Sequence, residues 1–340
     1  MKIIVDAFGG DHAPEEILKG CVQAQNELDI EIVLSGNKEK IHAAAKKCEI
    51  FDAVSKMEIL HCEDVITMED EPSKILKEKK NSSMAVGLRA LAEGKGDAFA
   101  SAGNSGALVV GSTMIVKRIH GIKRVTFAPV MPKLKGFFML SDVGANVDCR
   151  PVMLGQFAFM ASVYMKNVMG VENPRVGLLN VGTEEHKGDA LRTESYKLLK
   201  KMKNINFVGN VEAREVPFDG ADVIVTDGFN GNIVLKLYEG VATVLMSKIK
   251  GVFEKSLKNK LAASVVLGDM REMKKEIDYN EYGGAPIMGT KMPVFKIHGS
   301  AKAGTVKSAL RLTKDYAISG ITEAIAQAVS KQKEPKNETD

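Results

Sequence analysis

The sequence has few cysteines, and they lack the arrangements that usually give cysteine a function. Cys21, Cys48, Cys62 and Cys149 form no Cys-x-x-Cys pair. The apolar run in MKIIVDAFGG is too short for a signal peptide, so we expect buried thiols in a reducing compartment rather than disulfides. Cys149 has no neighbouring nucleophile signature, and we interpret it as a packed thiol.

Long apolar runs and a strong charge bias are also missing. No stretch reaches the about 18 apolar residues that suggest a membrane-spanning helix. The net charge of +4 over 340 residues is too small to argue for nucleic acid as a partner. We therefore expect a soluble, cytoplasmic protein.

Several common catalytic motifs do not occur. The sequence has no Gly-Lys-Ser/Thr of a Walker A loop and no Gly-x-Gly-x-x-Gly of a dinucleotide site. It also has no His-Glu-x-x-His and no Gly-x-Ser-x-Gly, which removes the usual marks of zinc proteases and α/β-hydrolases. Because no spacing of metal ligands stands out, we expect neither a metal nor a cofactor.

Short apolar runs are present throughout, and most are followed by a polar, glycine-containing turn and a helical pattern. This alternation predicts an α/β fold whose mostly parallel sheet is covered by helices on both faces. The expected strands are 2–6, 31–35, 97–101, 137–141, 176–179, 223–226 and 294–297.

The length and the 45% hydrophobic content favour two lobes. The polar break around Gly121 predicts a first lobe of 1–122, rejoined by the helices of 300–331. The second lobe is then 123–299. The charged tail, 332–340, lacks apolar anchors and is predicted to be disordered.

Six small, polar turns follow the predicted strands. In open α/β sheets, ligands bind beyond the carboxyl ends of the strands, so these turns predict a shared cleft. The turns are DAFGGDH, SAGNSG, DVGANVD, NVGTEEHKGD, TDGFNGN and HGSAKAG, and their candidate substrate-binding residues are Asp6, Gly10, Asp11, His12, Ser101, Gly103, Asn104, Ser105, Gly106, Asp142, Asn146, Asn180, Gly182, Thr183, Asp227, Gly228 and His298.

Each turn also has a purely structural reading. The backbone of SAGNSG suits an anion at a helix N-terminus, but its Ser and Asn equally suit a helix cap. The Asp11–His12 pair suggests acid–base chemistry or a hydrogen-bonded turn. Lys187 can balance phosphate charge or be a solvated lysine. The Asn232 amide can support an oxyanion or cap the helix expected at 233–255.

A different pattern occupies residues 241–267. Leu257, Leu261 and Val265 continue a helical apolar stripe, and lysines crowd the same segment. The pattern fits a helix packed on its own protein, a dimer surface, or a basic amphipathic helix on an anionic membrane. Periodicity alone favours packing.

Taken together, the turns resemble those of the bacterial phosphate acyltransferase family PlsX. The resemblance runs colinearly from about residue 2 to 320 and includes KKNSSM, GLLNVGTEE, NINFVGNVEAR and YGGAP besides the turns above. It implies an isocitrate-dehydrogenase- or phosphotransacetylase-like fold with a protruding helical tip. It also implies transfer of a long-chain acyl group from acyl carrier protein (ACP) to inorganic phosphate.

The same resemblance implies roles and partners. Lys187 and Asn232 match positions implicated in catalysis, and 245–267 matches a membrane-contacting tip that includes Leu257, Leu261 and Val265. The implied partners are ACP, phosphate, a second copy of the chain, an anionic membrane surface and a downstream membrane glycerol-3-phosphate acyltransferase. The implied location is the inner face of the cell membrane, peripherally bound.

Three alternatives remain at this point. A short-chain phosphotransacetylase that uses coenzyme A shares the fold and the reaction type. A metal- and nicotinamide-dependent decarboxylating dehydrogenase shares the architecture. A non-enzymatic membrane scaffold would explain the amphipathic segment, although it leaves six cleft turns unexplained.

Overall fold

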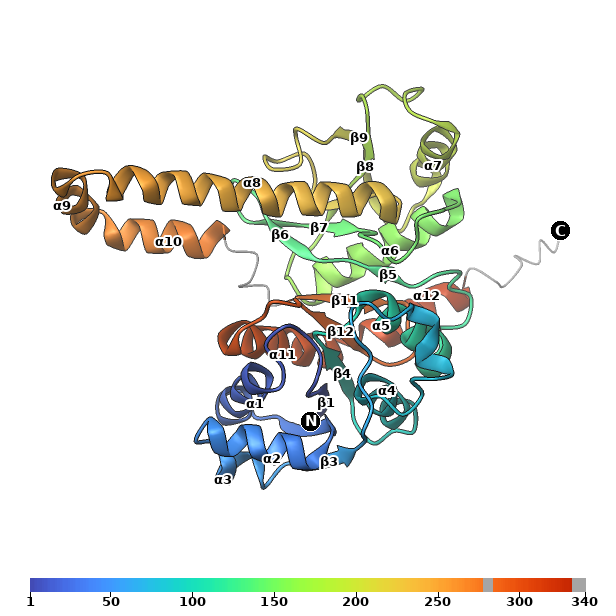
Figure 1. The fold of residues 1–340 in the computed structure, drawn as a ribbon. Coiled ribbons are helices and arrows are strands. Elements are labelled where there is room, and N and C mark those ends of the chain that lie inside the picture. The colour runs from blue at the N-terminus through green and yellow to red at the C-terminus, as the bar shows by residue number, and fades with distance from the viewer. Residues whose placement is uncertain (278–283, 332–340) are drawn as a thin grey trace.

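The chain forms two α/β lobes, from which a long helical arm projects (Figure 1). The structure is a computed structural model and describes residues 1–277 and 284–331. A seven-stranded sheet organises the lower lobe in Figure 1, and a five-stranded sheet organises the upper one. The predicted disordered tail and the first two residues of YGGAP lie outside the described residues.

The first sheet has the order β3-β2-β1-β4-β12-β11-β5 and is parallel except where β11 pairs with β12 and β5. Successive residues of β1 face opposite cores: Ile3 packs in the core on one face of the sheet, whereas Ile4 packs in the core on the other face. This two-sided burial explains the continuously apolar strands. The strands are β1 (Lys2–Asp6), β2 (Glu31–Gly36), β3 (Glu58–His61), β4 (Ala98–Ser101), β5 (Thr126–Phe127), β11 (Gly284–Met288) and β12 (Val294–Ile297).

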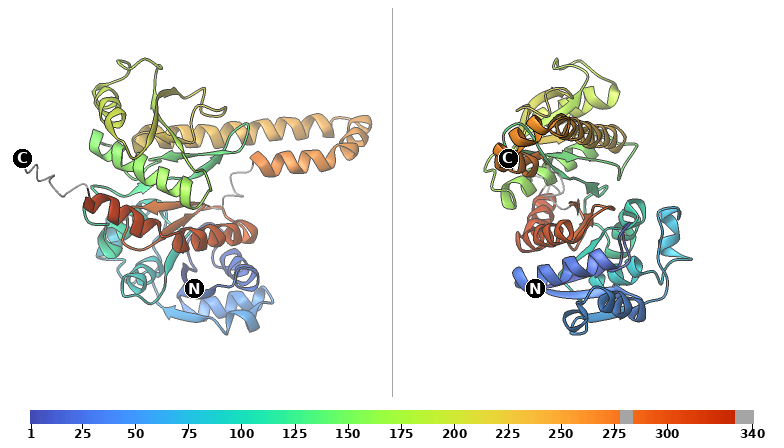
Figure 2. Two further views of the ribbon diagram at one scale, coloured as in Figure 1. Left: turned by 180° about the vertical axis from the view of Figure 1, so that it is seen from behind. Right: turned by 60° about the vertical axis from the view of Figure 1, so that its left-hand side comes forward.

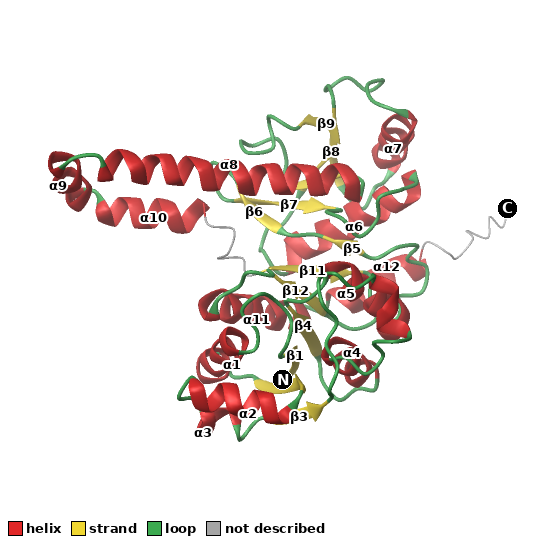
Figure 3. Ribbon diagram, viewed as in Figure 1, coloured by secondary structure: helices red, strands yellow, loops and turns green. Residues whose placement is uncertain are grey.

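Helices cover both faces of this sheet (Figure 3). They are α1 (Glu15–Glu27), α2 (Lys38–Lys47), α3 (Phe51–Val54), α4 (Ser83–Ala92), α5 (Ser105–Gly111) and α11 (Ala303–Ile318), with a 3₁₀ helix at Pro72–Leu76 and a π-helical segment at Ser112–Val116.

The second sheet has the order β6-β7-β10-β8-β9, and only the β6–β7 pair is antiparallel. The expected class of mostly parallel sheets flanked by helices is thus confirmed. The elements of this lobe are β6 (Val130–Pro132), β7 (Phe137–Ser141), β8 (Arg175–Asn180), β9 (Asn206–Glu212), β10 (Val223–Val225), α6 (Pro151–Asn167), α7 (Ala190–Lys201) and α12 (Ile321–Lys331).

The lobes exchange segments more than the expected boundaries allow. β11 and β12 fall in the predicted second lobe, 123–299, yet they pair in the first sheet. Helix α12, expected with the first lobe, contributes Ile321 and Ile325 to the core around α6. Figure 2 shows α11 and α12 between the two lobes. A local polar break cannot reveal such pairing, because the partners lie more than a hundred residues apart.

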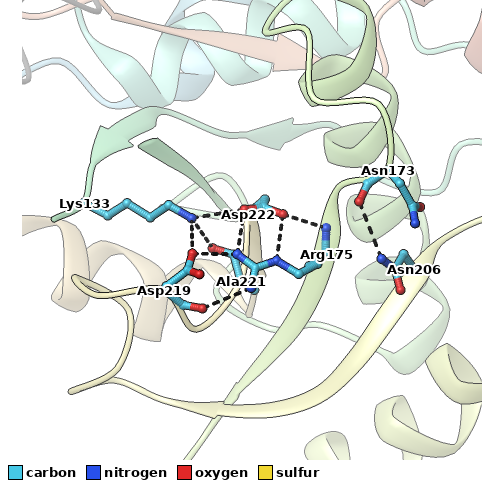
Figure 4. A network of polar contacts seen from close by, with 7 residues as sticks. All are labelled: Lys133, Asn173, Arg175, Asn206, Asp219, Ala221 and Asp222. Carbon is cyan, nitrogen blue, oxygen red and sulfur yellow. Dashed lines mark hydrogen bonds and ion pairs between the residues drawn. The ribbon is translucent and has the colours of Figure 1, made fainter. Parts of the chain in front are cut away.

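Four charged side chains fix the edge of the second sheet at which β8 begins (Figure 4). Arg175 donates to both Asp219 and Asp222, and Lys133 donates to the same two carboxylates at 2.9 and 3.0 Å. Burial opposes ionisation of Asp222, but the bonds from Arg175 and Lys133 hold its pKa below the usual range. This clamp lies opposite the carboxyl ends of the strands, so we interpret it as structural.

The arm consists of α8 (Gly228–Glu254), α9 (Leu257–Val265) and α10 (Leu267–Ile277). The expectation of one helical stripe through 253–265 is corrected, because the chain turns between α8 and α9. Ser256 caps α9 by accepting from the Asn259 backbone N–H, and the Asn259 side chain donates to the Val252 carbonyl at 2.7 Å. Within residues 1–277 and 284–331, no helix is long and apolar enough to cross a membrane.

Candidate functional site at the carboxyl ends of the two sheets

Three parallel strands of the first sheet, β1, β4 and β12, end beside one another. Asp6, at the end of β1, accepts hydrogen bonds from the Ser101 hydroxyl at 2.7 Å and the Phe8 backbone N–H at 3.1 Å. Burial raises the pKa of Asp6, although the Ser83 and Ser101 hydroxyls act in the opposite direction. The predicted proximity of the turns after these strands is therefore present, with Asp6 and Ser101 buried beneath them.

The loop after β1 is held close to the loop after β12. The Asp11 backbone N–H donates to the Gly299 carbonyl at 2.9 Å. Gly10 has φ +97°, and a Cβ there would lie 2.8 Å from the same carbonyl, so only glycine fits without strain. His12 lies in an exposed hollow on the outer surface, together with Asp11 and Glu16.

His298, in the turn after β12, lies opposite α8 of the second lobe. Its Nδ1 accepts from the Ser300 backbone N–H at 3.3 Å, which places the proton of the neutral ring on Nε2. That Nε2 lies 3.9 Å from Oε1 of Glu239 on α8. Burial lowers the pKa of His298, whereas Glu239 acts to raise it.

The SAGNSG turn divides into internal and accessible parts. Asn104 caps α5 by accepting from the Ala107 backbone N–H, and its amide donates to the carbonyls of Thr67 and Asp70. The Gly103 backbone N–H donates to the Ser101 hydroxyl, and Gly106 packs on Pro72. Ser105 is exposed and lines the cavity between the lobes.

That cavity, of about 370 Å³, lies between the carboxyl end of the first sheet and one face of α8. Its polar part includes Lys296 and His298. Its wall is largely apolar, since it includes Phe127, Met131 and Leu235. The other lining residues are Asp11, Met68, Ser105, Pro129, Val130, Lys236, Glu239, Gly284, Ala285, Gly299 and Ser300.

In the second sheet, the turn after β7 is built around a buried carboxylate. Asp142 accepts from the backbone N–H groups of Phe127, Val143 and Asn146, the last at 2.7 Å. The Asn146 amide donates to Asp142 and to the Val125 carbonyl. Both side chains are occupied inside the turn, and burial raises the pKa of Asp142. Their contribution to a ligand site is thus through the shape of the turn.

Helix α8 begins five residues earlier than the sequence predicts, because Asp227 is its cap. The Asp227 carboxylate accepts from the Asn230 backbone N–H at 3.0 Å and from the guanidinium of Arg192. Burial raises the pKa of Asp227, but the hydrogen bonds from Asn230 and the charge of Arg192 outweigh burial and hold the pKa below its usual value. Gly228 donates to the Asn146 carbonyl at 2.7 Å, and a Cβ there would lie 2.6 Å from that oxygen.

Arg192 was not identified from the sequence. It is 9% exposed and also donates to Asp189 at 2.9 Å, so it joins the end of the loop after β8 to the start of α8. Its position three residues after the Asp189 cap of α7 is the only local signal, and the partner Asp227 is distant in sequence.

Lys187 lies on the exposed loop after β8. Its backbone carbonyl accepts from the Asn180 amide at 3.0 Å, and its side chain passes over Gly182, where a Cβ would lie 3.2 Å from Lys187 Cγ. The ammonium is 4.0 Å from Glu184 Oε1, and the side chain is 45% exposed. Thr183 is exposed beside it. The loop therefore presents Lys187 to solvent at the carboxyl end of β8.

Asn232 lies within α8 rather than in a turn. It is exposed and lies near Gly144 of the turn after β7. Lys236 and Glu239 follow four and seven residues later, so all three share one face of the helix. Because Lys236 and Glu239 line the interlobe cavity, α8 connects the second-sheet turns to it.

Comparison with known proteins decides the family. A family model described as fatty acid synthesis protein matches residues 1–324. A phosphate acyltransferase of Clostridioides difficile (strain 630) is 44% identical over 342 residues, covering 100% of both chains. A phosphate acyltransferase of Bacillus subtilis (strain 168) is 43% identical over 335 residues, covering 98% of this chain and 99% of its own. The chain belongs to the phosphate acyltransferase family.

Solved structures agree with this family at the level of the fold. A phosphotransacetylase from Streptococcus pyogenes has a TM-score of 0.65 and 15% identity and covers 94% of each chain. The EutD phosphotransacetylase from Staphylococcus aureus has a TM-score of 0.61 and 18% identity and covers 93% of this chain and 94% of its own. The family resemblance and the phosphotransacetylase-like fold predicted from the turns are both confirmed. The roles predicted for individual residues stay predictions.

Replacing Lys187 by Ala tests the predicted catalytic role of this loop. We expect kcat/KM to fall roughly 30- to 1,000-fold, because loss of a charged contact to bound phosphate costs about 2–4 kcal/mol. Lys197→Ala, on the exposed face of α7, is the matched control. Steady-state kinetics and a melting curve measure both variants. An unchanged kcat/KM in folded Lys187→Ala would remove this residue from the mechanism.

Proposed function

We propose that this family member transfers a long-chain acyl group from the thioester of ACP to inorganic phosphate. The products are acyl-phosphate and free ACP, and the reaction is the first step toward phosphatidic acid. The interlobe cavity is the main structural support, because it combines a buried cation with a largely apolar wall. A charged acceptor and an acyl chain need these two environments side by side.

The chemistry requires positioning more than activation. An oxygen of hydrogen phosphate forms a bond to the thioester carbon, and the carbon–sulfur bond breaks. The phosphate proton is passed on, and the sulfur leaves as a thiol. A thioester is already electrophilic, so direct attack needs no covalent acyl-enzyme, and the protein contributes alignment and oxyanion support.

Residues predicted from the sequence can be assigned to these two roles, alignment of phosphate and support of the oxyanion. Lys187 and the backbone of the SAGNSG turn are proposed to bind phosphate, and Asn232 to donate to the oxyanion. Asn232 is accessible and shares its helical face with cavity-lining residues, which supports its assignment. Within the described residues, no three His, Cys, Asp or Glu side chains gather as a metal site would require.

Products decide between this function and its rivals. We expect mass spectrometry to find acyl-phosphate when the purified chain is incubated with long-chain acyl-ACP and phosphate, because the cavity offers an apolar wall to the chain. Acetyl-coenzyme A is the parallel substrate. Preference for acetyl-coenzyme A would identify a short-chain phosphotransacetylase instead. Reduction of NAD or NADP would identify a dehydrogenase. No turnover of any of these substrates would favour a non-enzymatic membrane scaffold.

The tip of the arm is proposed to contact an anionic membrane. Leu257, Leu261 and Val265 recur every four residues on α9 and are 76%, 63% and 83% exposed. No described residue of α9 is buried in this chain, so packing on its own protein does not explain the stripe. Exposed lysines surround it at 248, 250, 255, 258 and 260. An amphipathic helix of this kind suits the inner face of a cell membrane.

The same lysines can receive ACP, which is acidic in this family. A peripheral position on the membrane would also bring acyl-phosphate close to the membrane glycerol-3-phosphate acyltransferase that is proposed to consume it.

The base of the arm is proposed to contact a second copy of the chain. Phe229, Ile233, Leu237 and Val241 follow one another at intervals of four along α8, and each is at least 50% exposed. A continuous apolar stripe of this length is typical of a protein interface. Because it ends before α9, a homodimer formed here would leave the tip free.

Two substitutions test the membrane contact. Leu257→Glu with Leu261→Glu should abolish sedimentation with phosphatidylglycerol vesicles, because carboxylates replace apolar side chains and repel the anionic surface. Each lysine contributes about 1 kcal/mol near such a surface, so binding of the parent should weaken with salt. Turnover of soluble acyl-ACP should not change.

Leu134→Glu with Phe218→Glu is the matched control, since both side chains are exposed outside the arm. It should sediment like the parent, and no variant should sediment with phosphatidylcholine vesicles. Equal sedimentation of the tip variant and the parent would show that α9 does not bind the membrane.

A further inference from the structure

Lys296 is a buried lysine in the middle of a sheet. It lies on β12, where it pairs with Ser101 of β4 on one side and Ala285 of β11 on the other, and it is only 6% exposed. Burying an ammonium group is costly unless it is paired and hydrogen-bonded. Lys296 is also the one charged residue in the expected strand VFKI, which read as an otherwise apolar run.

The partners of this ammonium do not neutralise it. Nζ donates to the Ala102 carbonyl at 3.1 Å and to the Ile297 carbonyl, both uncharged. No carboxylate lies within 4.0 Å of Nζ among residues 1–277 and 284–331. An ammonium has three donors, so one N–H is left over.

The side chain lies at the interlobe cavity. Lys296 is one of the residues that line it, and Ala102, which holds Nζ, belongs to the SAGNSG turn. Lys133, which follows β6 and whose side chain is 6% exposed, differs because its ammonium binds two carboxylates. Lys133 is thus neutralised by carboxylates, as a structural lysine would be, whereas Lys296 is held by uncharged carbonyls at a cavity.

We propose that Lys296 is a catalytic residue, whose ammonium binds the oxygens of inorganic phosphate, and then of the acyl-phosphate product, at the polar part of the cavity. The proposal rests on the proposed acyl transfer to phosphate. The remaining N–H holds the attacking oxygen near the thioester carbon and offsets the charge that develops there. Lys296 keeps its proton throughout, and the proton of hydrogen phosphate passes to the sulfur.

The surroundings make this cation sensitive to pH. Burial lowers the pKa of Lys296 to about 8, while Asp6 and Asp11 act in the opposite direction and Lys236 lowers it further. His298 and Glu239 also line the cavity. Because the ammonium form binds phosphate, binding weakens as the pH rises through the pKa of Lys296, about 8.

Lys296→Met tests the proposal, because Met keeps the length of the side chain and removes the charge. The wild-type chain is first assayed for acyl-phosphate formation. We expect the KM for phosphate to rise roughly 100-fold in Lys296→Met, with the KM for acyl-ACP nearly unchanged. Lys133→Met is the matched buried-lysine control, and it should lower the melting temperature without changing the KM for phosphate.

The pH profile of the wild type tests the proposal even if Lys296→Met does not fold, because it needs no substitution at Lys296. In the wild type, the KM for phosphate should rise about tenfold per pH unit above the pKa of Lys296. The rise should persist in Lys236→Met and disappear in Lys296→Met. A flat wild-type profile, or a folded Lys296→Met with normal KM for phosphate, would overturn the proposal.

Calorimetry separates this proposal from the proposed function. Titration with inorganic phosphate alone should show binding to the wild type and none to Lys296→Met. If the wild type makes no acyl-phosphate but binds phosphate only with Lys296 present, the proposed function fails and the phosphate site stands. If acyl-phosphate forms and both proteins bind phosphate equally, the site assignment fails alone.

Discussion

The parallel alignment of two sets of strands is the constraint on which the site depends. β1, β4 and β12 end together in one sheet, and β7, β10 and β8 end together in the other. Each polar turn thus lies where backbone groups are no longer used by a sheet ladder. Buried carboxylates then fix the turns: Asp6 organises the first set and Asp142 the second. At the proposed site, substrate groups would therefore meet a framework whose hydrogen bonds are already made.

Helix α8 carries this arrangement from one lobe to the other. Its cap, Asp227, accepts from Arg192 in the second lobe. Between two and four turns later, Lys236 and Glu239 line the cavity beside His298 of the first lobe. The same helix continues outward to the arm. One element therefore connects the proposed catalytic turns, the proposed dimer stripe and the proposed membrane tip.

Much of the fold could be predicted because its signals are local. Apolar runs gave β1 and β7 with their observed bounds, and the six turns gave the sheet edges. The antiparallel β11 was not among the expected strands, and its pairing with β5, more than 150 residues earlier in the chain, has no local signal. Asn146 was predicted to bind substrate because it lies in a polar turn. Its amide instead donates to Asp142 and to the Val125 carbonyl within the fold. Arg192 was missed because only burial and the distant partner Asp227 distinguish it from an ordinary surface charge. Lys296 was missed although it is the one charged residue of the apolar run VFKI, because its burial at the cavity has no local signal.

The most direct test of the account is a crystal structure with a long-chain acyl phosphonate, a stable analogue of acyl-phosphate. The account predicts the phosphonate within hydrogen-bond distance of Lys296 Nζ, with the alkyl chain against Met131 and Leu235 between the lobes. A phosphonate bound outside this cavity, without contact to the ends of β1, β4 and β12, would contradict it.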